Sequence, residues 1–227
     1  MIRTAFVLTS LAALSTASAG VGGNLLGNAG FEDGTLFDVN AMENTGNWVA
    51  FFGGPEGVVL QSFQNTGATP FAGAAALETS IEGSGAGDGI GANAFTGQVQ
   101  FVDGVVGDGT YTFSIWARNN GSALNGGAEF RIEWFDAGGA IIGDQFGLNM
   151  DITSQLTDQY QLFSITADAP TNAAGLNAVF AVQSFANDGT ASDIAVAWDN
   201  ASVTLVPAPA GVALLGLGGF AATRRRR

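Results

Sequence analysis

The chain of 227 residues contains 20 Asp and Glu against 7 Lys and Arg, and neither cysteine nor histidine. Five of the seven basic residues lie near the chain ends, so two arginines face all twenty acids between Glu32 and Asp199, a net charge of −18. This composition disfavours nucleic acid and anionic lipid as partners, and it excludes disulfides, thiol nucleophiles and histidine-based triads.

The first 19 residues predict a cleaved secretory signal. Arg3 forms a short basic region, residues 5–14 are apolar, and Ala17-Ser18-Ala19 provides a small-residue cleavage site. We therefore expect an exported protein whose domain begins at Gly20. Because an exported chain without cysteine has no disulfide framework, an ordinary hydrophobic core must hold the domain together, with a metal ion as a further means.

Residues 20–206 predict one all-β domain. Asp-Gly and Asn-Gly dipeptides, which favour tight turns, separate runs of alternating polar and apolar residues, and no segment keeps a helical period. The expected strands are residues 48–52, 58–63, 74–79, 95–102, 110–118, 128–136, 160–167, 176–185 and 194–205. So many short strands in one domain predict an antiparallel β-sandwich of the jelly-roll kind.

Two of the expected strands carry the only arginines of the domain. Alternation puts Trp116 and Arg118 on the non-core side of one strand, and Arg131 and Glu133 on the non-core side of the next. If the two strands share a sheet, an exposed indole lies beside two cations and their neighbouring carboxylates. Such a group can stack on a sugar ring and hydrogen-bond its hydroxyls, so these residues are predicted to bind a ligand.

Two other interpretations compete with this site. In the structural alternative, the arginines pair with Glu129 or other nearby acids and a loop covers Trp116. In the second, Trp48, near the start of an expected strand, is the aromatic platform for the ligand.

The sequence favours binding over catalysis. Glu129 and Glu133, four residues apart on one strand, would lie about 13 Å apart along it, wider than the roughly 5 to 9.5 Å that glycosidases use. Residues 83–89, GSGAGDG, resemble a phosphate loop in composition but lack its lysine and following helix. We therefore expect no enzyme, with a weak polysaccharide hydrolase or lyase as the least favoured alternative.

The C-terminal segment, residues 207–227, differs from the rest of the chain. Pro207 and Pro209 precede an apolar run over residues 210–223. A helix over this run would be roughly 21 Å long at about 1.5 Å per residue, short of the hydrocarbon core of about 30 Å. The chain ends in four arginines, which would hold the end of this short transmembrane helix on the cytoplasmic side: Arg224, Arg225, Arg226 and Arg227. A permanent membrane anchor is the alternative to a segment that is held and then cut.

The order of proline motif, apolar helix and terminal arginines resembles the PEP-CTERM sorting signal of bacterial exported proteins. The motif stands here as Val206-Pro207-Ala208-Pro209, with Ala208 where the family has glutamate. The resemblance implies processing by an exosortase, a membrane transpeptidase-like protease. It also implies a final location at the cell surface or in an exopolysaccharide matrix.

Three further stretches resemble jelly-roll carbohydrate-binding modules of the family 4/9 kind. They are residues 24–34 (NLLGNAGFEDG), 109–118 (GTYTFSIWAR) and 197–203 (AWDNASV). The resemblance spans the domain and implies its fold and, less directly, glycan binding. It also implies a structural Ca²⁺ held by Glu32 and Asp199, on first and last strands that are neighbours in a jelly roll. The alternative is that these two carboxylates cap backbone N–H groups.

Together, the sequence predicts three parts: a signal peptide (1–19), a jelly-roll module (20–206) and a sorting segment (207–227). The expected function is an exported, surface-sorted, non-catalytic module that binds glycan or associates with an exopolysaccharide matrix. The alternative is a purely structural cell-surface or biofilm protein on the same fold, without sugar binding. The expected partners are a polysaccharide, an exosortase-type enzyme and, before processing, the membrane, but no nucleic acid.

Overall fold

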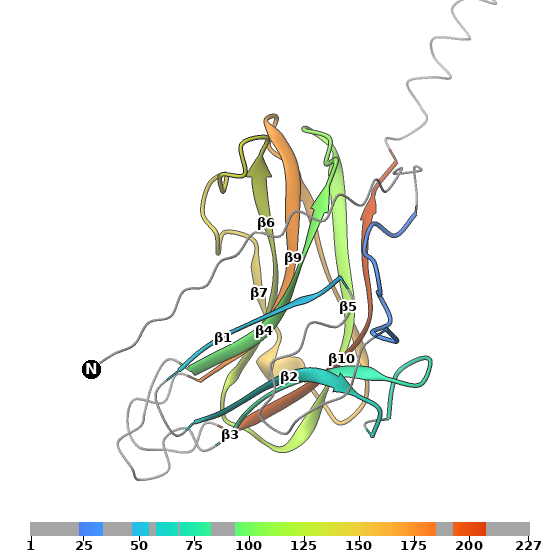
Figure 1. The fold of residues 1–227 in the computed structure, drawn as a ribbon, viewed down its shortest axis with the longest axis vertical. Coiled ribbons are helices and arrows are strands. Elements are labelled where there is room, and N and C mark those ends of the chain that lie inside the picture. Colours follow the sequence, from blue (N-terminus) through green and yellow to red (C-terminus); the bar gives the residue numbers. More distant parts are fainter. Residues whose placement is uncertain are drawn as a thin grey trace, which may run out of the picture.

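The computed structural model describes residues 23–33, 47–54, 58–67, 69–82, 94–184 and 193–207. The elements in these ranges are β1 (Val49–Gly53), β2 (Val59–Asn65), β3 (Ala76–Glu82), β4 (Ala94–Asp103), β5 (Thr110–Leu124), β6 (Gly127–Asp136), β7 (Asn149–Asp151), the 3-10 helix η1 (Thr153–Gln155), β8 (Gln161–Asp168), β9 (Ala173–Ser184) and β10 (Ile194–Leu205). The strands form two antiparallel five-stranded sheets, ordered β1-β4-β9-β6-β7 and β2-β3-β10-β5-β8. Figure 1 shows the two layers, and the predicted antiparallel β-sandwich is confirmed.

The predicted signal peptide, residues 1–19, lies outside the described residues, as does residue 208 onward of the predicted sorting segment. Within the described ranges, no helix is both long enough and apolar enough to cross a membrane. The three-part division of the chain therefore stays a prediction at both of its boundaries.

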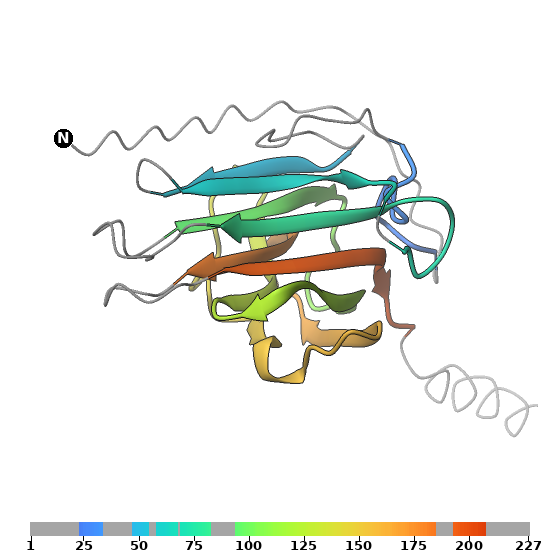
Figure 2. The same cartoon turned by 90° about the horizontal axis from the view of Figure 1, so that it is seen from below.

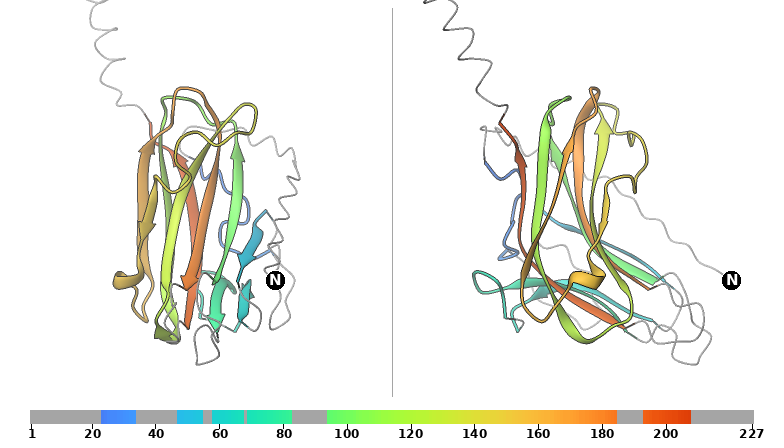
Figure 3. Two further views of the ribbon diagram at one scale, coloured as in Figure 1. Left: turned by 90° about the vertical axis from the view of Figure 1, so that its left-hand side faces the viewer. Right: turned by 180° about the vertical axis from the view of Figure 1, so that it is seen from behind.

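The core lies between the two sheets and is built by the alternation of the strands. On β5 and β6 every second side chain points into the core, because successive residues of a strand point to opposite faces of the sheet. The inward side chains are Tyr111, Phe113, Ile115 and Ala117 on β5 and Phe130, Ile132 and Trp134 on β6. Phe113 and Phe130 meet edge to face across the layers, with ring centroids 5.4 Å apart. The two further views in Figure 3 show these layers side by side.

An aromatic cluster fills one part of the core. Trp48 lies 5.3 Å from Phe31 and 5.2 Å from Phe180, measured between ring centroids, and Phe180 lies 4.9 Å from Trp198. All four rings have 0 % exposure. The indole N–H groups are satisfied internally, since that of Trp198 donates to Thr79 at 2.8 Å. Trp48 is therefore a core residue, and its prediction as a ligand platform is wrong.

The N-terminal motif attaches the start of the domain to its last strand. Asn24 donates through Nδ2 to the Ala201 carbonyl and accepts through Oδ1 from the Val203 N–H, at 2.9 and 3.0 Å. Farther on, Asn28 bonds both backbone groups of Asp33 and thereby closes a turn. The polar residues of this motif thus serve the fold.

β5 and β6 are consecutive strands, but they belong to different sheets. The two-residue link Asn125-Gly126 carries the chain from one layer to the other. A Cβ at Gly126 would lie 2.5 Å from the Gln183 carbonyl oxygen and 2.8 Å from Ile194 Cγ2, so this glycine is required by close packing at the crossing. The premise that both arginine-bearing strands share one sheet is therefore wrong.

Candidate functional site

The two arginines of the domain lie on opposite outer faces of the sandwich. Arg131 lies on the outer face of the β1-β4-β9-β6-β7 sheet, which we name the Arg131 face. Arg118 lies on the outer face of the β2-β3-β10-β5-β8 sheet, which we name the Arg118 face. The structure therefore brings Arg131 and Glu133 together, and Trp116 and Arg118 together, but it separates the two pairs.

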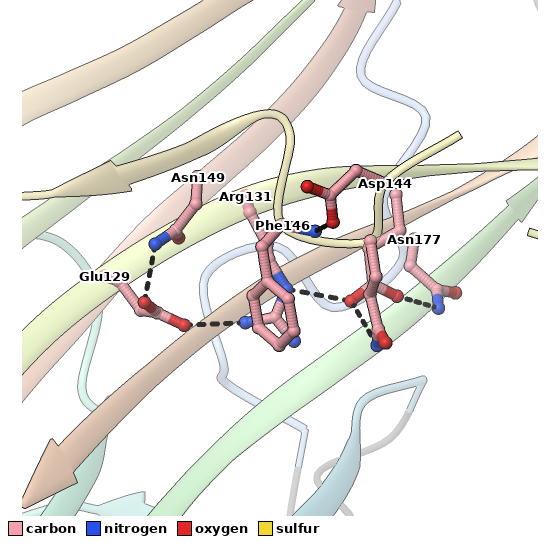
Figure 4. Close-up of polar contacts among 8 residues, drawn as sticks. Glu129, Arg131, Asp144, Phe146, Asn149 and Asn177 are labelled. Carbon is pink, nitrogen blue, oxygen red and sulfur yellow. Dashed lines mark hydrogen bonds and ion pairs between the residues drawn. The ribbon is translucent and has the colours of Figure 1, made fainter. Parts of the chain in front are cut away.

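A buried ion-pair network lies along β6 on the Arg131 face (Figure 4). Arg131 donates through Nη1 to Glu129 Oε1 and through Nε to Glu133 Oε1, each at 2.8 Å. Alternation along the strand places the three side chains on one side of β6, two residues apart. All three residues are buried. The network has a net charge of −1, so Arg131 is fully neutralised within the protein.

Neutral amides complete this network from neighbouring elements. Asn149 on β7 donates to Glu129 Oε2 at 2.6 Å, and Asn177 on β9 donates to Glu133 Oε2 at 2.9 Å. Gln145, in the loop between β6 and β7, donates to Glu133 Oε1 at 3.0 Å. All four carboxylate oxygens of Glu129 and Glu133 thus accept hydrogen bonds inside the protein. Direct contact of Arg131 or Glu133 with a ligand stays a prediction.

An exposed phenylalanine covers the network. Phe146 lies over the guanidinium, with Arg131 Cζ 4.9 Å from the ring centroid, and the ring is 56 % exposed. Its backbone N–H donates to Asp144 Oδ1 at 3.0 Å, which fixes the local turn (Figure 4). The buried charges therefore hold a solvent-exposed aromatic ring in place.

Strand β4 places its apolar side outward and its polar side inward. Phe95 and Phe101 are 36 % and 55 % exposed, whereas Gln98 and Gln100 are buried. Gln100 is satisfied by Gly27, accepting from its N–H at 2.6 Å and donating to its carbonyl at 2.9 Å. The strand is thus inverted relative to an ordinary sandwich strand, and its phenylalanines are left at the surface of the Arg131 face.

Phe101 lies in the same cross-strand row as the ion-pair network. The register aligns Glu133 of β6 with Asn177 of β9 and Phe101 of β4. The Phe101 ring also meets Phe135 edge to face at 5.8 Å. A Cβ at Gly175 would lie 2.4 Å from this ring, so the glycine lets the ring approach the sheet closely. The Arg131 face thus combines exposed rings with satisfied polar groups.

Trp116 on the Arg118 face is half-buried. Phe71, from the loop between β2 and β3, stacks on its indole with centroids 3.8 Å apart and planes 13° from parallel. The prediction of an openly exposed indole is therefore wrong, and the alternative in which a loop covers Trp116 is confirmed for the stacked side of the ring. Phe71 itself remains 41 % exposed.

Glu32 and Asp199 converge on that same loop. Glu32 accepts from the Ala74 N–H at 3.0 Å, and Asp199 Oδ2 accepts from the N–H groups of Phe71 and Ala72 at 2.8 and 2.9 Å. Burial raises the pKa of Asp199, against the effect of these backbone donors, and the nearby charge of Glu32 raises it further. Both carboxylates cap backbone N–H groups. Within the described residues, no three acidic side chains are grouped as they would be around a metal ion.

Comparison with known proteins shows the fold. No family model and no curated protein matches the sequence. The enzymatically active domain of tailspike protein 4 from bacteriophage CBA120 aligns with a TM-score of 0.56 and 15% identity, over 81% of this chain and 21% of that one. A structure described as explaining the promiscuous specificity of carbohydrate-binding modules from the β-sandwich superfamily aligns with a TM-score of 0.51 and 15% identity, over 82% of this chain and 63% of that one.

The CBM22-1 xylan-binding domain of Paenibacillus barcinonensis Xyn10C aligns with a TM-score of 0.49 and 18% identity, over 85% of this chain and all of that one. The chain thus spans about a fifth of the tailspike domain and less than two thirds of the superfamily structure. At 15% identity the likeness to the tailspike domain and to the superfamily structure shows the fold, and the predicted jelly-roll β-sandwich is confirmed.

Proposed function

We propose that the protein is a non-catalytic glycan-binding module whose Arg131 face contacts the sugar chain. The observation that carries this proposal is the inversion of β4, which exposes Phe95 and Phe101 while glutamines fill the interior. A folded domain rarely exposes several aromatic rings on one face without a partner for them. Rings stack on the apolar faces of pyranose sugars, and the fixed amides beside them can hydrogen-bond hydroxyls.

The charge of this face favours a neutral glycan. Arg131 is neutralised by two carboxylates, so the face offers no free cation to an acidic sugar. The same pairing supports a binding role over catalysis. Glu129 and Glu133 accept from one guanidinium, so neither is free to act as a general acid or a nucleophile in glycoside hydrolysis.

Removing either exposed ring is expected to weaken glycan binding. Phe101→Ala and Phe146→Ala should each lower the affinity for a bound neutral polysaccharide about threefold to tenfold, because each loses one stacking contact. The measurement is affinity electrophoresis of the 20–206 domain against a panel of neutral polysaccharides, followed by calorimetry with those that retard it.

Phe52→Ala is the matched control. Phe52 is 57 % exposed, but it lies on the other side of β1 from this face. Its loss should leave binding unchanged. If no polysaccharide retards the wild-type domain, the alternative of a structural surface protein without sugar binding is favoured instead.

We further propose that the protein is exported and sorted through its C-terminal segment. The last strand supports this, since β10 ends at Leu205 and the chain leaves the sheet just beyond it. The Val206 N–H still donates to the Thr110 carbonyl at 2.8 Å, and the exposed Pro207 follows. The motif therefore starts where the folded domain ends. In the native host, mature protein is expected to have lost the segment after roughly Pro209 and to leave the membrane fraction. Mass spectrometry that finds Arg224 to Arg227 intact in surface protein would favour a permanent anchor.

We also propose a structural Ca²⁺ beside Glu32 and Asp199, with backbone carbonyls as further ligands. Hard carboxylate oxygens suit this ion, and the pair is placed without an arginine partner. When the carboxylates bind the ion, it offsets their mutual repulsion.

The stability of the domain is expected to depend on calcium and pH together. Because the folded pKa of Asp199 is raised, stability without a cation falls as the pH rises above about 4 through that pKa. Excess Ca²⁺ should therefore raise the melting temperature relative to chelator at pH 7, and the difference should shrink toward pH 4. Asp199→Asn should abolish the difference at both pH values. Equal melting temperatures in calcium and in chelator at pH 7 would contradict the calcium site. Glu32 and Asp199 would then serve only to cap backbone N–H groups.

A further inference from the structure

The Arg118 face carries an aromatic group of its own. Tyr160, which immediately precedes β8, meets the exposed Phe71 ring edge to face at 5.9 Å. Phe71 in turn stacks on Trp116. Arg118 lies over the Tyr160 ring, with Cζ 5.3 Å from the centroid. Three rings and a guanidinium are thus in contact at one end of this face, assembled from β5, the start of β8 and the loop before β3.

Arg118 differs from Arg131 because it has no ion-pair partner in the part of the chain that the structure describes. Its Nε atom is buried without a hydrogen-bond partner, and so is the Tyr160 hydroxyl. Burial raises the pKa of Tyr160, and the nearby Arg118 guanidinium lowers it in part. The two carboxylates nearest to Tyr160 have other donors. Glu78 accepts from Asn65 and from a second amide at 2.7 and 2.6 Å, and Asp199 accepts backbone N–H groups.

Hydroxyl groups cover the neighbouring part of the same face. The register of β10, β5 and β8 aligns one row of serines and one row of threonines across the three strands. The rows are Ser202, Ser114 and Ser164, and Thr204, Thr112 and Thr166. Adjacent strands lie about 4.8 Å apart, so each row presents closely spaced donors and acceptors. This surface is suited to a ligand that is itself rich in hydroxyls.

We propose that the Arg118 face is a second carbohydrate site, which binds an acidic sugar residue of the uronate class. In this arrangement Arg118 receives the sugar carboxylate, because a guanidinium matches a carboxylate through two parallel hydrogen bonds. The exposed Phe71 ring, held rigid by its stack on Trp116, receives the apolar side of the pyranose. The site lies on a different sheet from the Arg131 face and is independent of the function proposed for that face.

The size of the apolar surface favours a sugar over a protein partner. Among the described residues of this face, the exposed large apolar side chains are Phe71 and Leu162, at 41 % and 53 % exposure. Fully burying an aromatic side chain covers about 150–250 Å². A specific protein interface covers about 800 Å² on each partner. Two half-exposed side chains match one or two sugar rings much better than a protein surface.

The test is an NMR titration that follows the indole N–H resonance of Trp116, assigned with Trp116→Phe. The probes are sodium glucuronate, galacturonate and mannuronate, with glucose, galactose and mannose at matched sodium chloride as neutral controls. We expect at least one uronate to shift this resonance until the shift saturates. We expect no such shift with the neutral sugars. Arg118→Gln should weaken uronate binding at least tenfold, and Arg118→Lys should weaken it less, because lysine keeps the charge but loses the planar fork.

Several results would overturn the proposal. These are a Trp116 resonance unmoved by all three uronates, equal binding of the neutral sugars, or wild-type uronate affinity in a folded Arg118→Gln variant. Sedimentation that shows self-association lost in Arg118→Gln would identify a protein contact instead. Phe146→Ala must leave uronate binding unchanged. If that variant abolishes it, the sugar occupies the Arg131 face and the second site does not exist.

Discussion

Arg131→Met is expected to destabilise the domain by about 3–5 kcal/mol, because it leaves the buried carboxylates of Glu129 and Glu133 without their shared cation. Methionine keeps much of the side-chain volume, so the loss reflects charge more than packing. The three residues lie at 7 %, 6 % and 4 % exposure, and solvent therefore screens little of the repulsion between the carboxylates. The measurement is the free energy of unfolding in urea.

A second variant separates charge from shape at this site. Replacing the network as a unit, with Glu129→Gln and Glu133→Gln added to Arg131→Met, should recover a large part of the lost stability, since no buried charge remains. A triple variant less stable than Arg131→Met would show that the carboxylates stabilise the fold through Asn149 and Asn177 even without the arginine.

Trp48→Ala is expected to lower the free energy of unfolding by about 3–5 kcal/mol, because it opens a cavity in the aromatic cluster. The indole packs between Phe31 and Phe180, and its N–H donates to the Asn28 carbonyl at 3.1 Å, so the cavity also leaves a carbonyl without its donor. The measurement is chemical denaturation followed by circular dichroism.

Phe52→Ala, on strand β1, which directly follows Trp48, is the control for this cavity. Its ring is 57 % exposed, and its loss should change stability by less than about 0.5 kcal/mol. Because a domain of this kind has about 5–15 kcal/mol of stability, Trp48→Ala should still fold and bind glycan with wild-type affinity under native conditions. Loss of glycan binding in a folded Trp48→Ala variant would instead show that Trp48 contributes to the ligand site.

The alternation of polar and apolar residues predicts most of the strands. Residues 110–118 and 128–136 are strands with the predicted core sides, because a half-buried strand needs period-two patterning. The Asn-Gly dipeptide at residues 120–121 is one of the predicted turns, but β5 runs through it to Leu124. The strand is irregular there, because its pairing with β10 passes from Asn119↔Val196 directly to Leu124↔Ile194. The three-residue edge strand β7 is too short to carry a pattern.

The candidate site could be predicted less well from the sequence, because it depends on which sheet each strand joins. Alternation shows that Arg118 and Arg131 point away from the core, but it does not show that a two-residue link sends β6 to the other layer. The Phe95 to Phe101 side of β4 looks like a core side by composition. It is recognised as surface only when buried partners for Gln98 and Gln100 are seen. Phe146, in a loop, had no periodic signal at all.

The position of β10 has a mechanical consequence for the proposed attachment through the C-terminal segment. Figure 2 shows β10 in the middle of its sheet, and its backbone pairs with β3 on one side and β5 on the other. A pull that enters at Pro207 runs along this strand and loads both ladders of hydrogen bonds in shear at once. Hydrogen bonds that are loaded in shear must break together, so they resist force far better than hydrogen bonds that are peeled apart one at a time. The strand next to the proposed attachment point is therefore the one best placed to bear tension.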